Sequence, residues 1–269
     1  MRAGRTPRKL PGSMSPPPRF NVLGTGVSAL SLAEARDRVL AARGRKHLGY
    51  ICCATAYNLD LARSDEGLRQ AYNGSFLTTP DGMPLVWLGR ALGHRAITRV
   101  YGPDLMLEVC LTGCAVGLTH YFYGGAPGAA EALRDELGFL FPSLQVVGTF
   151  TPPFRDLDAA EFATLQADIA AKQPDVVWVG LSTPKQEKFM VAHGAALDTG
   201  LLIGVGAAFD FLSGRVPQAP RWMQRGGLEW LHRLGTEPRR LWRRYLLHSP
   251  MFVLRTLAQL TGLKKYPLD

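Results

Sequence analysis

Short apolar runs alternate with amphipathic stretches over most of the chain. Brief apolar runs bounded by turn residues are typical of buried strands, and longer segments with apolar residues at helical spacing predict helices. The predicted strands cover residues 48–54, 75–79, 119–123, 145–149, 175–180 and 201–205. The predicted helices cover residues 58–72, 103–115, 127–141, 159–172 and 184–197.

This alternation predicts a Rossmann-like α/β fold, with a mostly parallel sheet and helices on both of its faces. Sheets of this kind bind their ligands beyond the carboxyl ends of the strands. We therefore look for chemistry in the residues that follow the predicted strands. These segments are residues 55–58, 81–82, 124–125, 181–186 and 206–210.

The two ends of the chain differ in composition from the middle. Residues 1–19 are rich in proline and arginine and poor in apolar residues, which predicts a disordered tail. Residues 20–214 form the predicted α/β catalytic domain. From residue 215 onward, tryptophans alternate with basic residues, and we expect a helical, membrane-proximal appendage over 215–269.

Charge follows the same division. The chain carries a net charge of +9, with +5 on residues 1–19 and +8 on residues 215–269, which leaves the middle at −4. The basic ends therefore suit an anionic partner such as phosphate groups, an acidic membrane surface or a nucleic acid.

Cysteine usage and hydropathy indicate a cytoplasmic protein. Cys52, Cys53, Cys110 and Cys114 lack the spacing of a metal site, so we expect buried, reduced thiols and no bound metal. The N-terminus has no apolar segment of the signal-peptide type, and the longest apolar run, residues 105–118, is too short to span a bilayer.

Two glycine motifs are candidates for nucleotide binding. Residues 24–29 fit a GxGxxA fingerprint, but no acidic residue ends the following strand, so a surface turn is the preferred interpretation. Gly124 and Gly125 follow an apolar strand, and Pro127 then opens a helix whose free N–H groups favour an anion. For this second motif, a phosphate site and a tight turn are both open.

Asp81 stands at a strand end between Pro80 and Gly82. An aspartate in such a position can form a turn through its own side chain. If it lies in a cleft beside an acceptor hydroxyl, the same carboxylate is a general base, and an ordinary aspartate pKa of about 3.9 keeps it ionised at neutral pH.

A third polar segment leaves a strand and enters a helix through Pro184, followed by Gln186 and Glu187. These side chains can bind a substrate at the sheet edge or act as a helix cap, and both roles are compatible. Asp210 follows the last strand in the same way.

Arginines and tryptophans are interleaved in the appendage. Arg240 and either Arg243 or Arg244 are one helical turn apart, so their guanidinium groups can converge on one phosphate. A solvated face is the ordinary alternative, but Trp222, Trp230 and Trp242 favour a membrane interface.

Together these motifs resemble the WecG/TagA/CpsF family of bacterial glycosyltransferases over roughly residues 20–250. The resemblance is carried by residues 54–58 (ATAYN), 80–86 (PDGMPLV), 101–104 (YGPD), 124–125 (GG), 183–187 (TPKQE), 204–215 (GVGAAFDFLSGR), 219–223 (APRWM), 227–230 (GLEW) and 237–245 (EPRRLWRRY).

The resemblance implies a metal-independent, inverting transfer from a UDP-sugar to an undecaprenyl-diphosphate-linked sugar, without a cofactor. The sugar would be N-acetylmannosamine, its uronic acid or a hexose, and the product would enter a teichoic acid, enterobacterial common antigen or exopolysaccharide. The protein would act at the inner face of the cell membrane. The family's base falls on Asp81. Its substrate-binding residues fall on Thr55, Asn58, Gln186, Arg233, Arg240 and Arg243.

The full set of predicted substrate-binding residues adds the glycine loop and the other strand-end residues. It consists of Thr55, Asn58, Gly124, Gly125, Pro184, Gln186, Glu187, Asp210, Arg233, Arg240 and Arg243. We expect Asp81 to lie near the double-glycine loop, with the arginines of the appendage pointing into the same cleft. A nucleotide-dependent oxidoreductase and a nucleic-acid-binding module are the alternatives from other functional classes.

Overall fold

The computed structural model describes residues 15–268, with the side chain of Arg240 left out. Its centre is a parallel sheet of six strands in the order β4-β3-β8-β7-β5-β6. The strands are β3 (Gly49–Ala54), β4 (Leu77–Pro80), β5 (Thr119–Gly124), β6 (Gln145–Phe150), β7 (Val176–Gly180) and β8 (Leu201–Gly204). Each of the six predicted strands is confirmed. The central strands β7 and β8 are short, almost wholly apolar runs, as burial on both faces requires, whereas the edge strand β6 is only partly buried.

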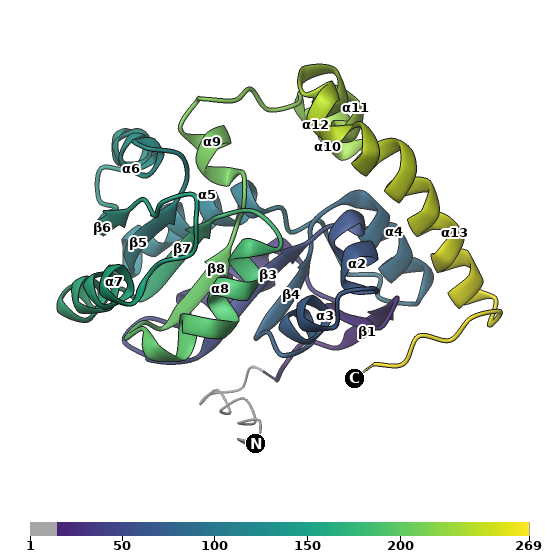
Figure 1. Ribbon diagram of the computed structural model, residues 1–269, viewed down its shortest axis with the longest axis horizontal. Coiled ribbons are helices and arrows are strands. Elements are labelled where there is room, and N and C mark those ends of the chain that lie inside the picture. The colour runs from purple at the N-terminus through teal and green to yellow at the C-terminus, as the bar shows by residue number, and fades with distance from the viewer. Residues whose placement is uncertain (1–14, 269) are drawn as a thin grey trace.

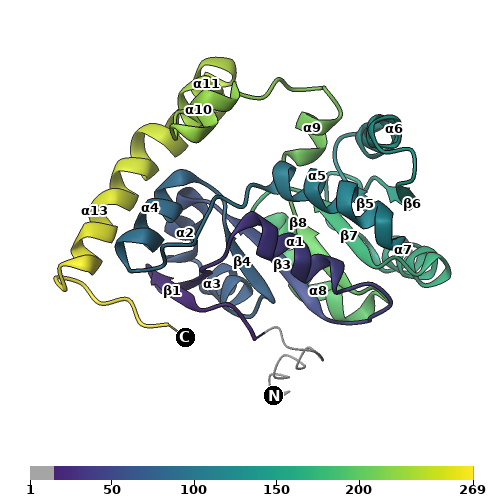
Figure 2. The ribbon, with the colours of Figure 1, turned by 180° about the vertical axis from the view of Figure 1, so that it is seen from behind.

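Helices cover both faces of the sheet, as predicted. One face carries α2 (Ala56–Ala62), α3 (Glu66–Asn73), α7 (Ala159–Lys172) and α8 (Lys185–His193), and α3 and α8 lie in front of the sheet in Figure 1. The other face carries α1 (Leu32–Leu40), α5 (Gly102–Gly113), α6 (Ala129–Leu140) and α9 (Ala208–Leu212), and α1 and α5 are in front in Figure 2. Cys52 and Cys53 point to opposite faces and belong to the two different cores.

Several elements differ from the sequence prediction. The predicted helix 58–72 is divided into α2 and α3, because the side chain of Asp65 accepts a hydrogen bond from the N–H of Leu68 and starts a new helix. The α1 helix was not predicted, although Ser31 and Glu34 form a capping box at its start. The α4 helix (Met83–Ala91) after Asp81 was also not predicted.

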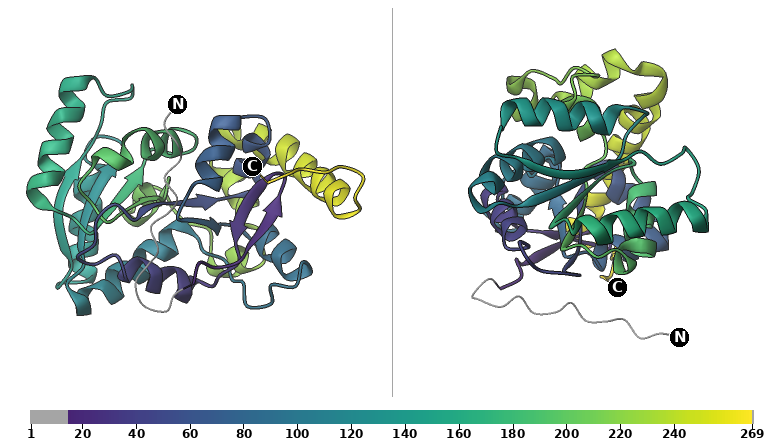
Figure 3. Two further views of the ribbon diagram at one scale, coloured as in Figure 1. Left: turned by 90° about the horizontal axis from the view of Figure 1, so that it is seen from below. Right: turned by 90° about the vertical axis from the view of Figure 1, so that its left-hand side faces the viewer.

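The GxGxxA segment forms part of an antiparallel hairpin of β1 (Arg19–Val22) and β2 (Thr25–Ser28). It is a turn, but not a surface turn, because the end of the chain covers it. The side-chain amide of Asn21 donates to the carbonyl of Tyr266, and a Cβ on Gly24 would lie 3.2 Å from the carbonyl oxygen of Pro267. The left view of Figure 3 shows the C-terminus beside this hairpin.

Residues 215–268 form a helical arm, which we call the C-terminal arm. It contains α10 (Arg221–Arg225), α11 (Glu229–Thr236), α12 (Pro238–Trp242), the π-helical segment η3 (Arg243–His248) and α13 (Ser249–Leu260). The arm rises above α9, crosses to the other end of the sheet, and descends along α4 and α2 (Figure 1). Most of the predicted N-terminal tail, residues 1–14, lies outside the described residues, and Arg19 already belongs to β1.

Candidate active site

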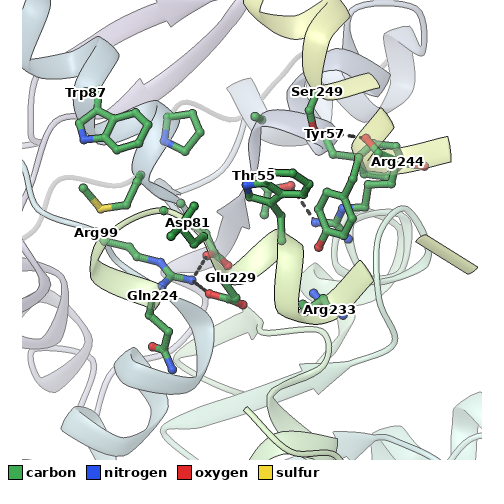
Figure 4. A pocket seen from close by; sticks show the side chains of 18 of the residues that line it. Thr55, Tyr57, Asp81, Trp87, Arg99, Gln224, Glu229, Arg233, Arg244 and Ser249 are labelled. Atoms are coloured by element: carbon green, nitrogen blue, oxygen red, sulfur yellow. Dashed lines mark hydrogen bonds and ion pairs between the residues drawn. The ribbon is translucent and has the colours of Figure 1, made fainter. Parts of the chain in front are cut away.

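A cavity of about 620 Å³ lies between the carboxyl ends of β3 and β4 and the inner side of the C-terminal arm. Thr55 and Asp81, the residues that directly follow β3 and β4, line one wall. Residues of α11, η3 and α13 line the opposite wall, and Figure 4 shows several of these side chains converging. The site therefore forms where the fold class predicts a ligand, and the arm completes it.

Asp81 is held at the base of this cavity by its backbone. Its N–H donates to the carbonyl of Ala54 at 2.8 Å, which fixes the residue at the end of the β3–β4 pair. The side chain is only 13% exposed, and this burial raises the pKa of the Asp81 carboxyl to about 6. The nearby Glu229 carboxylate raises the pKa further, whereas Arg99 and Arg244 oppose the shift.

This environment differs from the ordinary aspartate that we assumed from the sequence. A carboxylate with a pKa near 6 is mostly ionised at neutral pH and binds a proton more strongly than an exposed aspartate does. It is therefore better suited to general-base chemistry, for which the most effective pKa lies near the working pH.

Three further residues, to which the sequence analysis assigned no role in the site, surround Asp81. Arg99 places its Nη2 atom 3.7 Å from Asp81 Oδ1 and 2.5 Å from Glu229 Oε2. Its guanidinium carbon lies 4.0 Å from the centre of the Tyr101 ring. Arg99 comes from the segment between α4 and α5, and Glu229 is the first residue of α11. The sequence signal for Tyr101 and Glu229 was their place in the YGPD and GLEW segments, and Arg99 lies two residues before the first of these.

The arginines of the C-terminal arm have different positions. Arg233 lines the cavity from α11, where its guanidinium carbon lies 5.4 Å from the centre of the Phe211 ring. Arg244 also lines the cavity, over the ring of Tyr57 at 4.8 Å, and its Nη2 atom donates to Thr55 Oγ1 at 3.4 Å.

Arg243, which we predicted to bind substrate, does not line the cavity. It is exposed beside Trp242, and its neighbour Arg244 faces inward instead. Consecutive side chains of a helix point in different directions, so the docking that turns Arg244 toward the cavity turns Arg243 away from it. The backbone of Arg240 belongs to α12, and its side chain lies outside the described part of the chain.

A buried hydrogen-bond network supports the wall formed by Thr55. The Thr55 hydroxyl donates to Asn58 Oδ1 at 2.8 Å, and Asn58 Nδ2 donates to the Thr183 hydroxyl at 2.9 Å. Thr183 in turn donates to Glu187 Oε1 at 2.9 Å. The side-chain oxygen of Gln186 accepts from the N–H of Gly206. Asn58, Gln186 and Glu187 are thus brought together, but they lie below the cavity and only Thr55 reaches it.

The double-glycine loop is far from Asp81, contrary to our expectation. Strands β3, β8 and β7 separate β4 from β5, which at about 4.8 Å per strand spacing amounts to about 19 Å. A Cβ on Gly124 would lie 2.7 Å from the carbonyl of Gly180, and one on Gly125 would lie 2.7 Å from the Cβ of Ala129. Both glycines therefore permit close packing of the turn.

Pro184 and Asp210 also lie along the carboxyl edge without lining the cavity. Pro184 precedes the first turn of α8, and Asp210 lies within α9, where its backbone carbonyl accepts from the N–H of Val216. The predicted site residues consequently form two groups along one sheet edge. One group, with Asp81, Thr55 and Arg233, lies under the arm, and the other lies toward β5.

Comparison with known proteins gives a family match over nearly the whole chain. The model of the family described as "Glycosyl transferase WecG/TagA/CpsF family" matches residues 20–266. An N-acetylglucosaminyldiphosphoundecaprenol N-acetyl-beta-D-mannosaminyltransferase of Bacillus subtilis is 28% identical over 198 residues, which is 74% of this chain and 75% of that protein. A protein of the same name from Bacillus spizizenii is 30% identical over 178 residues, 66% of each chain.

Proposed function

The chain belongs to the WecG/TagA/CpsF family of glycosyltransferases, and from this we propose that it transfers a sugar from a UDP donor to an undecaprenyl-diphosphate-linked sugar. The transfer inverts the anomeric centre and uses no metal ion. The product contributes to a cell-surface polysaccharide such as a teichoic acid or an exopolysaccharide.

N-acetylmannosamine is the donor sugar that we propose first. The names of both Bacillus relatives specify an N-acetyl-beta-D-mannosaminyl group and an N-acetylglucosaminyl-diphosphoundecaprenol acceptor. N-acetylmannosaminuronic acid and a hexose are the other donors to be compared with it.

One observation carries the mechanism: Asp81, a carboxylate with a raised pKa, shares one cavity with the arm residues Arg233 and Arg244. Asp81 removes the proton from the acceptor hydroxyl as the oxygen attacks the anomeric carbon. The bond between that carbon and the diphosphate breaks on the opposite side, and UDP leaves with the electron pair. Arg233 and Arg244 neutralise the negative charge that develops on the diphosphate, which for one well-placed donor contributes about 3 to 4 kcal/mol.

The donor extends from the cavity along the carboxyl edge of the sheet. Its sugar and diphosphate lie under the arm beside Thr55, and its nucleotide lies toward Gly124, Gly125 and Asp210. This placement is supported by the topology of the sheet. The residues around Asp81 and the double-glycine loop lie at the same carboxyl edge, on either side of the Asn58–Gln186–Glu187 network.

The C-terminal arm places the enzyme on the inner face of the membrane. The outer side of η3 and α13 exposes an apolar stripe, and Lys264 and Lys265 follow it. Among residues 15–268 no helix has the length and hydropathy needed to cross a bilayer. An amphipathic helix of this kind lies in the interface, with its apolar side among the lipids. The stripe consists of Leu247, Met251, Leu254, Leu257 and Leu260.

The two alternatives from other functional classes gain no support from the site. The dinucleotide fingerprint belongs to a hairpin whose turn is covered by the chain terminus. Trp230 and Tyr245 of the arm line the cavity, whereas a stacking surface for bases would require such side chains on an open face.

The test is sugar transfer by Asp81→Asn. We expect UDP release from UDP-N-acetylmannosamine, with a short-chain lipid-diphosphate-N-acetylglucosamine acceptor, to fall by about 10² to 10⁴ because the general base is lost. UDP binding measured by calorimetry should be retained. Asp135→Asn on the exposed side of α6 is the matched control and should transfer at the wild-type rate. Wild-type turnover by Asp81→Asn would overturn the assignment, and a screen with other UDP-sugars identifies the donor.

A further inference from the structure

One nitrogen atom of Arg99 lies at different distances from two carboxylates. Nη2 lies 2.5 Å from Glu229 Oε2, which is a short charge-assisted hydrogen bond, and 3.7 Å from Asp81 Oδ1, which is beyond hydrogen-bond distance. Figure 4 shows Asp81 and Glu229 on the same side of the guanidinium, each joined to it by a dashed line. Arg99 therefore forms a hydrogen bond with Glu229 of the C-terminal arm, and it lies near the proposed base Asp81 without a hydrogen bond to it.

The three side chains come from two different parts of the fold. Asp81 and Arg99 belong to the α/β body, whereas Glu229 opens α11 of the C-terminal arm. All three are almost buried, with 13%, 15% and 16% of the respective side chains exposed. The ion pair between Arg99 and Glu229 consequently exists only when the arm is docked over the cavity.

Arg99 has few other positions to adopt. The ring of Tyr101 packs against one side of its guanidinium at 4.0 Å, and its Nε atom is buried without a hydrogen-bond partner among the described residues. A movement of about 1 Å toward Asp81 would be enough to convert the 3.7 Å approach into a direct hydrogen bond. Such a pair would occupy a lone pair of the carboxylate and stabilise its ionised form, which makes it a weaker base.

We propose that Glu229 is a positioning residue, which holds Arg99 away from Asp81 so that docking of the C-terminal arm leaves the base free to accept a proton. This inference rests on the proposed function, in which Asp81 is the base. The C-terminal arm would then contribute a positioning carboxylate to the reaction in addition to its arginines.

Asp81 is surrounded by several other ionisable groups, and each must be considered in a test based on pH. Arg99 and Tyr101 face it from the segment before α5, Glu229 from α11, Arg244 from η3, and Cys53 from β3. Burial raises the pKa of the Cys53 thiol and of the Tyr101 hydroxyl, so neither titrates near neutral pH. We therefore assign the acidic limb of the pH profile of kcat/KM to Asp81.

The experiment compares the pH dependence of kcat/KM for sugar transfer in two variants with opposite expected effects. Wild type should lose activity below about pH 6, as Asp81 becomes protonated. Glu229→Gln removes the acid that holds Arg99, so the acidic limb of the kcat/KM profile should move down by about one pH unit. Because Asp81 is then a weaker base, kcat should fall about tenfold, while KM for the donor changes less. Arg99→Met removes the cation that stabilises ionised Asp81, so the acidic limb of the kcat/KM profile should move up by about one pH unit.

The double variant and two surface variants complete the design. With Arg99 replaced by Met, the additional Glu229→Gln change should shift the acidic limb down by less than it does in wild type, because only the direct repulsion between Glu229 and Asp81 is then lost. Glu136→Gln and Arg134→Met on α6 make the same charge changes on exposed side chains and should leave the profile unchanged. Circular dichroism verifies that each variant is folded.

The outcomes separate this inference from the proposed function. An unchanged acidic limb in Glu229→Gln, or an equal downward shift from Glu229→Gln with and without Arg99, would overturn the positioning role of Glu229 while Asp81 stays the base. If instead Asp81→Asn is as active as wild type, or wild type transfers no sugar from any UDP donor, the proposed function itself fails.

Discussion

At the scale of single residues, Glu187 is the most deeply buried acid of the site region. It has no exposed surface, and one of its oxygens accepts hydrogen bonds from the hydroxyls of Tyr72 and Thr183 and from the amide of Gln186. Its other oxygen has no partner among the described residues. Burial raises the pKa of the Glu187 carboxyl, so the folded protein favours its neutral form more than the unfolded chain does. Glu187 therefore supports the wall of the cavity through Thr183 and Asn58.

Glu187→Ala should lower the free energy of unfolding by about 3 kcal/mol or more, because it leaves three buried donors without their acceptor. Glu187→Gln keeps an acceptor oxygen and should cost less. The raised pKa also fixes the sign of the pH dependence: the contribution of Glu187 to stability is present at acidic pH and declines as pH rises through the folded-state pKa. Urea unfolding at several pH values measures both effects, and equal losses for the Ala and Gln variants would contradict this role.

At the scale of elements, α13 is fixed to α2 through one buried acid. Asp60 on α2 forms an ion pair with Arg255 and lies 3.0 Å from Nδ1 of His248, and only 2% of its side chain is exposed. The same short helix begins just after Thr55 and carries Tyr57, on which Arg244 stacks. The arm is thus attached to the element that bears one wall of the site, so its docking and the shape of the cavity depend on the same contacts.

Asp60→Asn should loosen the arm without unfolding the sheet. Removing one partner of a buried ion pair typically costs about 3 to 5 kcal/mol, and here the cost falls on the contact between α13 and α2. We expect faster hydrogen exchange in residues 243–260 and a lower rate of sugar transfer, with exchange in the central strands unchanged. Asp198→Asn removes a more exposed acid, paired with Lys46, and is the control. Equal protection of the arm in Asp60→Asn and wild type would show that other contacts hold it.

At the scale of the whole molecule, the cavity and the apolar stripe lie on opposite sides of one arm. Val253 of α13 lines the cavity, whereas Leu254 and Leu257 are more than half exposed on the outer surface. A molecule resting on a membrane through this stripe would hold its cavity beside the headgroups, where a diphosphate attached to a lipid is found. Membrane binding and catalysis can therefore be separated by substitution.

Replacing Leu254 and Leu257 together by serine should weaken binding to anionic vesicles at least tenfold, since a buried leucine side chain contributes about 1.5 kcal/mol or more. Transfer to a water-soluble, short-chain acceptor should be unaffected, because neither side chain lines the cavity. Co-sedimentation with vesicles that contain phosphatidylglycerol measures the first effect. Phe139→Ser, which removes a largely exposed aromatic on α6, is the control. Undiminished vesicle binding by the double variant would exclude the stripe as the contact.

The sequence determined the elements and the position of the proposed base within them. Burial on both faces leaves short, mainly apolar runs in the central strands, and this signal is local, so the strands could be identified without knowing their neighbours. Asp81 could be placed at a strand end for the same reason. The family resemblance was also present in local motifs, and the family match confirms it.

Tertiary structure alone decided which of these elements meet. Strand order separates Asp81 from Gly124 and Gly125, because β4 is at one edge of the sheet and β5 is near the other. Docking of the arm turns Arg244 into the cavity and leaves Arg243 outside, whereas the helical spacing from Arg240 allowed either residue. Arg99 and Glu229 are far apart in the chain, and only docking of the arm brings their charges together, since an ion pair depends on distance in space rather than on sequence.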